Sequence, residues 1–142
     1  FNLGVMYDQG QGVLQHYKTA VKWYTLAAEQ GHADAQFNLG VMYSKGDGVP
    51  QDYKTTVKWY TLAAEQGYAK SQFNLGLMYA QGEGVLQDNI YAHMWWNIAA
   101  SSGKSKNASN NRDIIAKWMT PSQLETAQKL ARECVRTEYN WC

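Results

Sequence analysis

The sequence has almost no net charge, no long apolar run and only two cysteines. Its 13 basic and 12 acidic residues give a formal net charge of +1, so neither nucleic acid nor an anionic membrane surface is expected as a partner. No stretch approaches the ~18 apolar residues of a transmembrane helix, so no membrane insertion through such a helix is expected. These absences leave a packed domain whose surface contacts other molecules as the subject to examine.

Residue sets for catalysis or metal binding are also scarce. The histidines His16, His32 and His93 lack the i, i+4 spacing of a metal-binding pair, and we expect no metal and no cofactor. Residues 101–104 have the Ser-x-x-Lys spacing of the β-lactamase nucleophile. They lie across a predicted helix-ending glycine, however, and the chain has no Ser-Asp-Asn or Lys-Thr-Gly motif. The sequence therefore predicts no catalytic residue and no enzymatic activity.

The dominant feature of the chain is a repeat with a period of 36 residues. Residues 37–72 read FNLGVMYSKGDGVPQDYKTTVKWYTLAAEQGYAKSQ, and residues 1–36 repeat this string with nine changes. A looser copy begins at Phe73. One unit of this size cannot bury its apolar face alone, so the fixed period predicts a stacked array. We expect a single domain over 1–142, made of repeats 1–36, 37–72 and 73–108 and a helical cap over 109–142.

Each repeat is predicted to contain two helices. In the second copy, residues on one helical face recur at three- and four-residue steps from Ala33 to Tyr43. Gly46 and Gly48 stop this helix, and Asp52 is the expected N-cap of the next one, which ends near Gly67. The Gly-x-Gly pairs recur in all three copies without the lysine of a phosphate-binding loop, which favours turn geometry.

A glycine stands inside the first helix of every copy, as Gly4, Gly40 and Gly76. Glycine in a helix interior costs about 1 kcal/mol relative to alanine. We interpret its recurrence as a close approach of a neighbouring helix, with Ala63 and Ala64 on the facing side. The six tryptophans and ten tyrosines lie mostly at repeating positions, which is typical of helix packing.

The repeating residues resemble a known family, the Sel1-like repeat, a relative of the tetratricopeptide repeat. The resemblance covers residues 1–103 in all three copies; Thr56 replaces the usual alanine, and His16 stands where the other copies have aspartate. It implies an all-α fold, a right-handed α-α superhelix or solenoid of helix pairs. In the third copy the pattern comprises Ala69, Leu75, Gly76, Tyr79, Gly82, Gly84, Val85, Asp88, Ala92, Trp95, Trp96, Ala99, Ala100 and Gly103.

After Gly103 the repeat pattern ends. Residues 101–111 are rich in serine, asparagine and lysine and are expected to form a loop or frayed turn. A short amphipathic helix carrying Ile114, Ile115, Trp118 and Met119 is expected next. Thr120, Pro121 and Gln123 then give the start signal of a last helix, with a capping box. This stretch resembles the Met-Thr-Pro-x-Gln segment of bacterial Sel1-like proteins, and its physical role is to cap the array.

The two cysteines, Cys134 and Cys142, leave two alternatives open. Along an unbroken helix their α-carbons would lie about 12 Å apart, too far for a disulfide. If the helix ends near Glu138 and residues 139–141 double back, the pair could close; otherwise both thiols are free. A formed disulfide would indicate an oxidising compartment, and the tail resembles the cysteine-ended tails of exported family members. Together these favour a periplasmic or secreted location over a cytoplasmic one.

The first helix of each repeat is expected to line a concave groove that holds a peptide or partner helix. Asparagines beside this row could hydrogen-bond the main chain of the bound partner. In the alternative interpretation, the apolar positions pack between helices and the asparagines are solvated. The groove positions are Asn2, Val5 and Gln9 in the first copy, Phe37, Asn38, Val41, Ser44 and Lys45 in the second, and Phe73, Asn74, Leu77 and Gln81 in the third.

The resemblance implies a non-enzymatic scaffold or adaptor that binds a protein or peptide in this groove. The alternative is a peptidoglycan-related or β-lactam-binding enzyme, as proposed for cysteine-rich relatives. A third hypothesis concerns the start of the chain, since Phe1 opens in the middle of a repeat. A fragment of a longer protein is expected, and its open repeat face could associate end to end.

Overall fold

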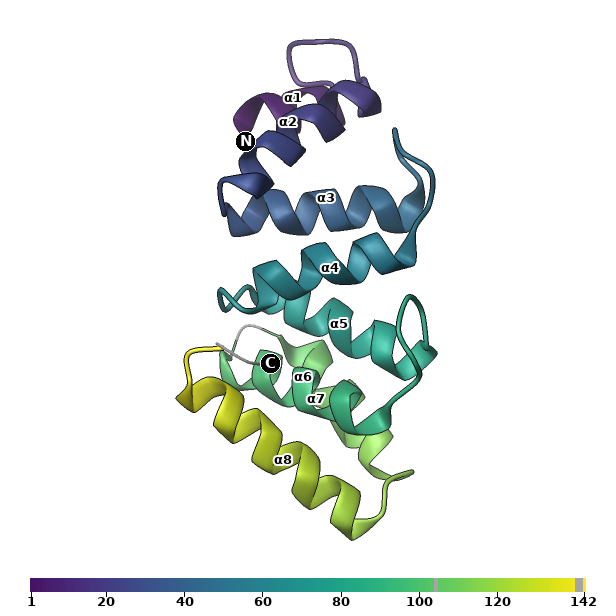
Figure 1. Ribbon diagram of the computed structural model, residues 1–142, viewed down its shortest axis with the longest axis vertical. Helices are drawn as coiled ribbons and strands as arrows, with labels where there is room; N and C mark the ends of the chain where they lie inside the picture. The colour runs from purple at the N-terminus through teal and green to yellow at the C-terminus, as the bar shows by residue number, and fades with distance from the viewer. Residues whose placement is uncertain (104, 140–141) are drawn as a thin grey trace. The chain divides into compact units, whose positions relative to one another are not determined.

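The computed structural model describes residues 1–103, 105–139 and 142, and this part of the chain contains eight α-helices and no strand. None of the described helices combines the length and the apolar character needed to cross a bilayer. The helices belong to two compact units, Phe1–Ala63 and Ala64–Cys142 (Figure 1). They are α1 (Asn2–Gln9), α2 (Tyr17–Glu29), α3 (Ala33–Lys45), α4 (Tyr53–Ala64), α5 (Ala69–Gln81), α6 (Asn89–Ser101), α7 (Lys106–Ala116) and α8 (Pro121–Arg136).

In the first unit, α2 packs against both α1 and α3 (Figure 1). The helices meet through small and aromatic residues: the buried cluster contains four alanines together with Tyr24, Leu39 and Met42. Val5, Tyr43 and Trp59 are among the partly buried side chains packed against it. Small residues let the backbones approach closely while the aromatic rings fill the remaining space.

The interior glycines allow a close approach, but the residue that approaches differs from the predicted one. A Cβ atom on Gly40 would lie 2.6 Å from Tyr60 Cε1, and one on Gly4 would lie 2.6 Å from Tyr24 Cδ1. An aromatic ring, and not Ala63 or Ala64, therefore covers the glycine. The ring needs the whole face of the helix backbone, which explains why even alanine does not fit there.

The ends of the helices follow the predicted signals. Gly46 takes a left-handed conformation, φ 79°, and its N–H donates to Met42 O. Asp52 Oδ1 accepts from the backbone N–H groups of Lys54 and Thr55, as expected of an N-cap. His16, which replaces this aspartate in the first repeat, also caps its helix, because its Nδ1 accepts from Thr19 N at 3.2 Å.

A glutamine in each loop binds the end of the preceding helix. Its Nε2 donates to the backbone carbonyl oxygen seven residues earlier. This bond satisfies a carbonyl that the helix itself leaves without an internal partner. The pairs are Gln15 with Asp8 O at 2.7 Å, Gln51 with Ser44 O at 2.7 Å and Gln87 with Ala80 O at 2.9 Å.

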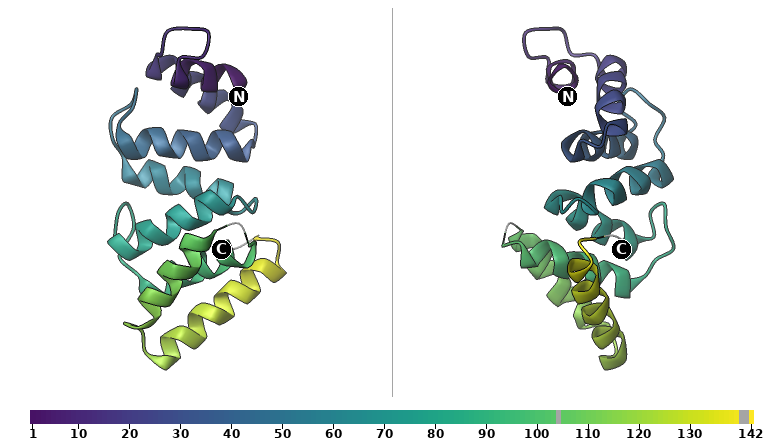
Figure 2. Two further views of the ribbon diagram at one scale, coloured as in Figure 1. Left: turned by 180° about the vertical axis from the view of Figure 1, so that it is seen from behind. Right: turned by 60° about the vertical axis from the view of Figure 1, so that its left-hand side comes forward.

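In the second unit, α6 is the central helix and packs against α5, α7 and α8 (Figure 2). Seven of its thirteen residues are buried, including Trp95, Trp96 and Ile98. Trp96 lies over Gly76, and its Nε1 donates to Phe73 O at 3.1 Å. The indole therefore repeats the arrangement of the tyrosines over Gly4 and Gly40 in the first unit.

The helix after the third repeat begins and ends earlier than predicted. Residues 106–111 belong to α7 and not to a loop, because Ser105 caps the helix by accepting from Ala108 N and Ala108 is completely buried. Trp118 lies beyond the end of α7 and is 80% exposed, so the predicted apolar face does not extend to it. Lys104 lies outside the described residues.

The last helix, α8, begins with the predicted capping box. Thr120 Oγ1 accepts from Gln123 N at 3.2 Å, and Gln123 Oε1 accepts from Thr120 N at 2.9 Å. Pro121 occupies the first position, where its missing N–H costs no hydrogen bond. Ala127, Ala131 and Cys134 are the buried residues of the helix.

Removing this cap should weaken the second unit measurably. Thr120→Ala deletes one partner of the capping box, and we expect a loss of about 1 kcal/mol in the free energy of unfolding. Urea unfolding followed by circular dichroism would measure it. Thr126→Ala is the matched control, since Thr126 is exposed and its hydroxyl bonds only the Ser122 carbonyl within the same helix. An equal loss in both variants would contradict a capping role.

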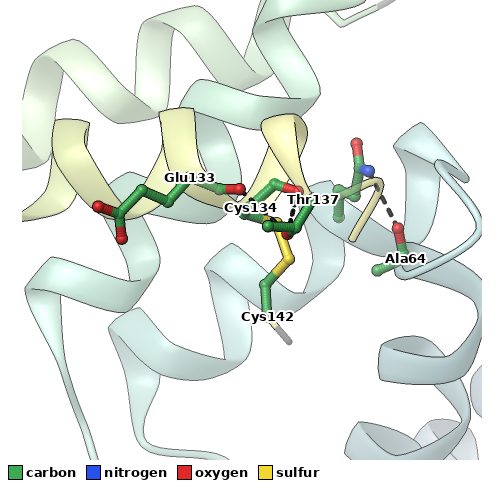
Figure 3. Close-up of a disulfide and its surroundings, with 6 residues drawn as sticks. Ala64, Glu133, Cys134, Thr137 and Cys142 are labelled. Atoms are coloured by element: carbon green, nitrogen blue, oxygen red, sulfur yellow. Dashed lines mark hydrogen bonds between the residues drawn. A yellow bond between two sulfur atoms is a disulfide. The ribbon is translucent and has the colours of Figure 1, made fainter. Parts of the chain in front are cut away.

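The tail after α8 turns back, and Cys134 and Cys142 are joined by a disulfide with their α-carbons 5.6 Å apart (Figure 3). The reversal starts at Glu138 and Tyr139, which both have positive φ, 53° and 66°. The Tyr139 ring lies against the Gly67 turn, within 3.5 Å of where a Cβ would stand. Residues 140 and 141, which were expected in this turn, lie outside the described residues.

Candidate functional site

In the first unit, the predicted groove residues on α1 and α3 have unequal exposure. Asn2, Gln9 and Lys45 are exposed, whereas Phe37 and Val41 are half-buried. The exposed members lie at the ends of their helices. The side chains available to a partner are therefore mainly polar and terminal.

Several groove residues already have partners within this unit. The Phe37 ring stacks on Tyr60 with centroids 5.7 Å apart, and Val5 packs against the buried cluster. The Tyr24 hydroxyl donates to Asp8 Oδ2 at 3.2 Å. Burial and the nearby Asp8 carboxylate raise the pKa of Tyr24 above its usual range, and the Asn38 amide acts on this pKa in the opposite direction, lowering it. These contacts join α1, α2, α3 and α4, and they fix the orientation of the residues beside them.

In the second unit, the predicted groove residues on α5 divide in the same way. Phe73 and Leu77 are half-buried and pack against the cluster around Trp96. Asn74 is half-buried, and Gln81, at the end of α5, is exposed. A partner would therefore meet partly covered apolar side chains with an exposed polar residue beyond them.

The serine–lysine motif shows no arrangement for nucleophilic catalysis in its described part. Ser101 Oγ donates to Ile98 O at 2.7 Å, and Ser102 Oγ donates to Ala99 O at 2.8 Å. Both hydroxyls thus bond to the last turn of α6, as serine commonly does at a helix end. Among residues 1–103, 105–139 and 142, no three His, Cys, Asp or Glu side chains are grouped so as to hold a metal ion.

A polar concavity of the second unit lies elsewhere, where α6, α7 and α8 meet. It has a volume of about 410 Å³, within the range of small-ligand sites. His93 lies in it with only 3% of its surface exposed, and its Nδ1 has no hydrogen-bond partner among the described residues. The lining residues of this cap cleft are His93, Asn97, Arg112, Asp113, Ala116, Leu124, Gln128 and Arg132.

Comparison with known protein families identifies the repeat of this chain. The family model described as Sel1 repeat matches residues 1–32, 33–68 and 69–104. The chain belongs to the Sel1 repeat family. The matched segments have the 36-residue period expected from the sequence, with boundaries four residues earlier than those drawn from Phe37 and Phe73. Sel1 repeat proteins generally mediate protein–protein interactions and are typically non-enzymatic scaffolds.

Two solved bacterial structures resemble this Sel1 repeat chain. One is c5321, a protective antigen present in uropathogenic Escherichia coli strains with an SLR fold, at 33% identity and a TM-score of 0.88 over 97% of this chain. The other is a Sel1 repeat protein from Oxalobacter formigenes, at 42% identity and a TM-score of 0.68 over 70% of this chain. These matches confirm the predicted fold class, an all-α repeat superhelix.

The chain spans less than half of each of these relatives, 30% of c5321 and 40% of the Oxalobacter protein. The search of the curated proteins gives no match. The family therefore establishes the repeat and its general role, and the residues of this chain must supply anything more specific.

The cap cleft was missed in the sequence because its residues come from three helices. A signal was nevertheless present: His93 occupies the position of Val21 and Val57 in the other two Sel1 repeats. Since valine satisfies the packing of the repeat there, a buried histidine is a departure that packing alone does not require. Arg112 and Arg132 lie beyond the last repeat and have no counterpart to compare.

His93 should make the stability of the protein depend on pH. Burial lowers the pKa of His93 below its usual 6.5; Arg112 lowers it further and Asp113 raises it. Below pH 6.5 the unfolded chain therefore binds more protons than the folded one, and the free energy of unfolding should fall as the pH decreases toward the lowered pKa. Urea unfolding between pH 7.5 and 5.5 should show this loss. His93→Gln should flatten the profile, and an unchanged profile would contradict the assignment to His93.

Proposed function

We propose that the chain is a non-enzymatic scaffold or adaptor whose first-helix surfaces, on α1, α3 and α5, bind a protein or peptide. The family supports a role in protein–protein interaction. The exposed groove residues Gln9, Lys45 and Gln81 supply hydrogen-bonding groups at the same place in successive repeats, and Asn2 adds an exposed amide at the start of α1. Helix-pair repeats commonly use such a surface for extended partners.

One observation carries this proposal: the repeats differ mainly at the ends of their first helices, and between the shared strings the only change is from Val5 and Val41 to Leu77. The strings Phe-Asn-Leu-Gly and Met-Tyr recur in all three copies. The two residues that follow Met-Tyr are Asp8 and Gln9, then Ser44 and Lys45, then Ala80 and Gln81. A nearly constant framework with varied end residues, of which Gln9, Lys45 and Gln81 are exposed, fits a surface that recognises a partner.

A charge reversal on this surface tests the proposal. Lys45→Glu changes an exposed side chain, so the fold should be kept while capture of a binding partner by the purified chain is lost. Lys22→Glu is the matched control, because Lys22 is an exposed lysine on α2, the second helix of its repeat. A partner lost with both variants or with neither would contradict a site on the first helices.

A further inference from the structure

The cap cleft contains a buried group that lacks a partner. His93 Nδ1 is inaccessible to solvent and has no hydrogen bond among the described residues. An unsatisfied buried polar atom destabilises a protein by roughly 1–3 kcal/mol, and native structures keep few of them without a functional reason. Because Nδ1 is closed to solvent in this structure, a ligand oxygen can reach it only when the side chains over the ring move aside.

The neighbouring side chains present donors to the same space. Arg112 Nη1 donates to Asn97 Oδ1 at 3.3 Å, which directs the amide nitrogen of Asn97 to some other acceptor. Arg132 and Gln128 line the cleft from α8. The cleft thus combines a guanidinium, a histidine and two amides, a set that matches a ligand rich in acceptor oxygens.

The charges of the cleft fix the charge of that ligand. Asp113 Oδ1 accepts from Arg112 Nε at 2.9 Å and from Arg112 Nη2 at 2.8 Å, so these two charges largely offset one another. Arg132 remains as one net positive charge among the residues that line the cap cleft, since Arg136 lines only the adjoining concavity. A monoanion neutralises it, whereas a dianion such as phosphate would leave excess negative charge beside the Asp113 carboxylate. A planar carboxylate also fits the bidentate geometry of arginine.

A second concavity adjoins this one and has a different character. It shares Asn97 and Arg132 with the cap cleft and is otherwise lined by Ile98, Ala131, Val135, Ser101 and Arg136. The aliphatic side chains of Ile98 and Val135 can take an apolar neighbour of the carboxylate. The shared Arg132 and Asn97 place the two features next to one another on α6 and α8.

We propose that the cap cleft binds the carboxylate of an acidic side chain that is followed by an apolar residue, in a protein or peptide partner. Arg132, which is exposed, donates to the carboxylate. His93 lies at the cleft beside it and joins this contact when the side chains over Nδ1 move aside. The adjoining apolar surface takes the next side chain. This site lies in the second unit on α6, α7 and α8. It is separate from the first-helix surface of the proposed function and does not depend on it.

The test is a titration of the whole chain with a small probe, followed by nuclear magnetic resonance of the arginine Nε and histidine ring nitrogens. The probe is N-acetyl-glutamyl-leucine amide; its uncharged counterpart is N-acetyl-glutaminyl-leucine amide. Glutamate should shift the Arg132 and His93 signals saturably, and glutamine should not. Equal shifts with both probes, or no shift with either, would overturn the proposal. Tighter saturation of the same signals by inorganic phosphate would overturn the carboxylate assignment.

Two variants complete the experiment. Arg132→Gln removes an exposed cation, and we expect roughly tenfold weaker binding or more, the usual effect of losing a charged hydrogen bond. Lys129→Gln removes one positive charge from the exposed surface of the same helix and should bind like the original chain. Equal weakening by both variants would indicate general electrostatic attraction and overturn the site.

Discussion

Gly76→Val is expected to destabilise the second unit by about 3 kcal/mol, the upper end of what overpacking usually costs. The first added carbon alone would lie within 2.7 Å of Trp96 Cε2 and closer still to Nε1. The indole cannot swing away cheaply, because Trp96 Nε1 is hydrogen-bonded to Phe73 O and the side chain is 4% exposed. The gain in helix propensity over glycine, below about 1 kcal/mol, does not offset this. Urea unfolding followed by circular dichroism would measure the loss.

A double-mutant cycle shows whether the ring is the cause. In a Trp96→Ala background the space above Gly76 is open, so the further cost of Gly76→Val should fall below about 1 kcal/mol and the two changes should couple strongly. Gln81→Ala, at an exposed position of the same helix, is the surface control and should stay within about 0.5 kcal/mol of the original. An unchanged penalty in the Trp96→Ala background would contradict the packing explanation.

Opening the disulfide is expected to cost about 2–3 kcal/mol in the free energy of unfolding. The bond joins residues eight apart in sequence, and the chain entropy released on opening a loop of this size corresponds to that range. Reduction also frees Tyr139 from its place against the Gly67 turn. Urea unfolding with and without a phosphine reductant measures the difference.

Cys142→Ser separates this effect from other actions of the reductant. Cys142 is half-buried, whereas Cys134 is completely buried, so changing Cys142 opens the bond without leaving a large cavity in the core. The variant should be destabilised as much as the reduced original and should not respond to reductant. A reductant effect of the same size in the variant would contradict the assignment to this bond.

Local signals in the sequence were sufficient for most helix boundaries. Gly46, Asp52 and Thr120 act through groups one to four residues away, so their roles can be predicted without knowing the tertiary structure. The last cap is the clearest example, because both hydrogen bonds of the capping box join residues 120 and 123. The 36-residue period and the family resemblance then predicted how these helices form one fold class.

The tertiary partners could not be predicted in the same way. The open helix surface at Gly40 can be covered either by a small residue or by a flat aromatic ring. Only the tertiary structure shows that the Tyr60 ring covers it. The start of α7 was predicted too late because serine, asparagine and lysine favour loops. The Ser105 cap and the burial of Ala108 outweigh that tendency. The cap cleft joins His93 to Arg112 and Arg132, which are far apart in sequence and share no motif.

The loop glutamines have a consequence for how such chains diversify. The side chains of Gln51 and Gln87 donate to the backbone carbonyl oxygens of Ser44 and Ala80, so these hydrogen bonds do not depend on the side chain at either position. Mutation at these two sites therefore leaves the glutamine its acceptor, although the Ala80 side chain also packs against the cluster around Trp96. A combinatorial library that keeps Ala80 and randomises residues 44, 45 and 81 should consequently yield mostly folded clones, so new binding specificities can be selected with little penalty in foldability.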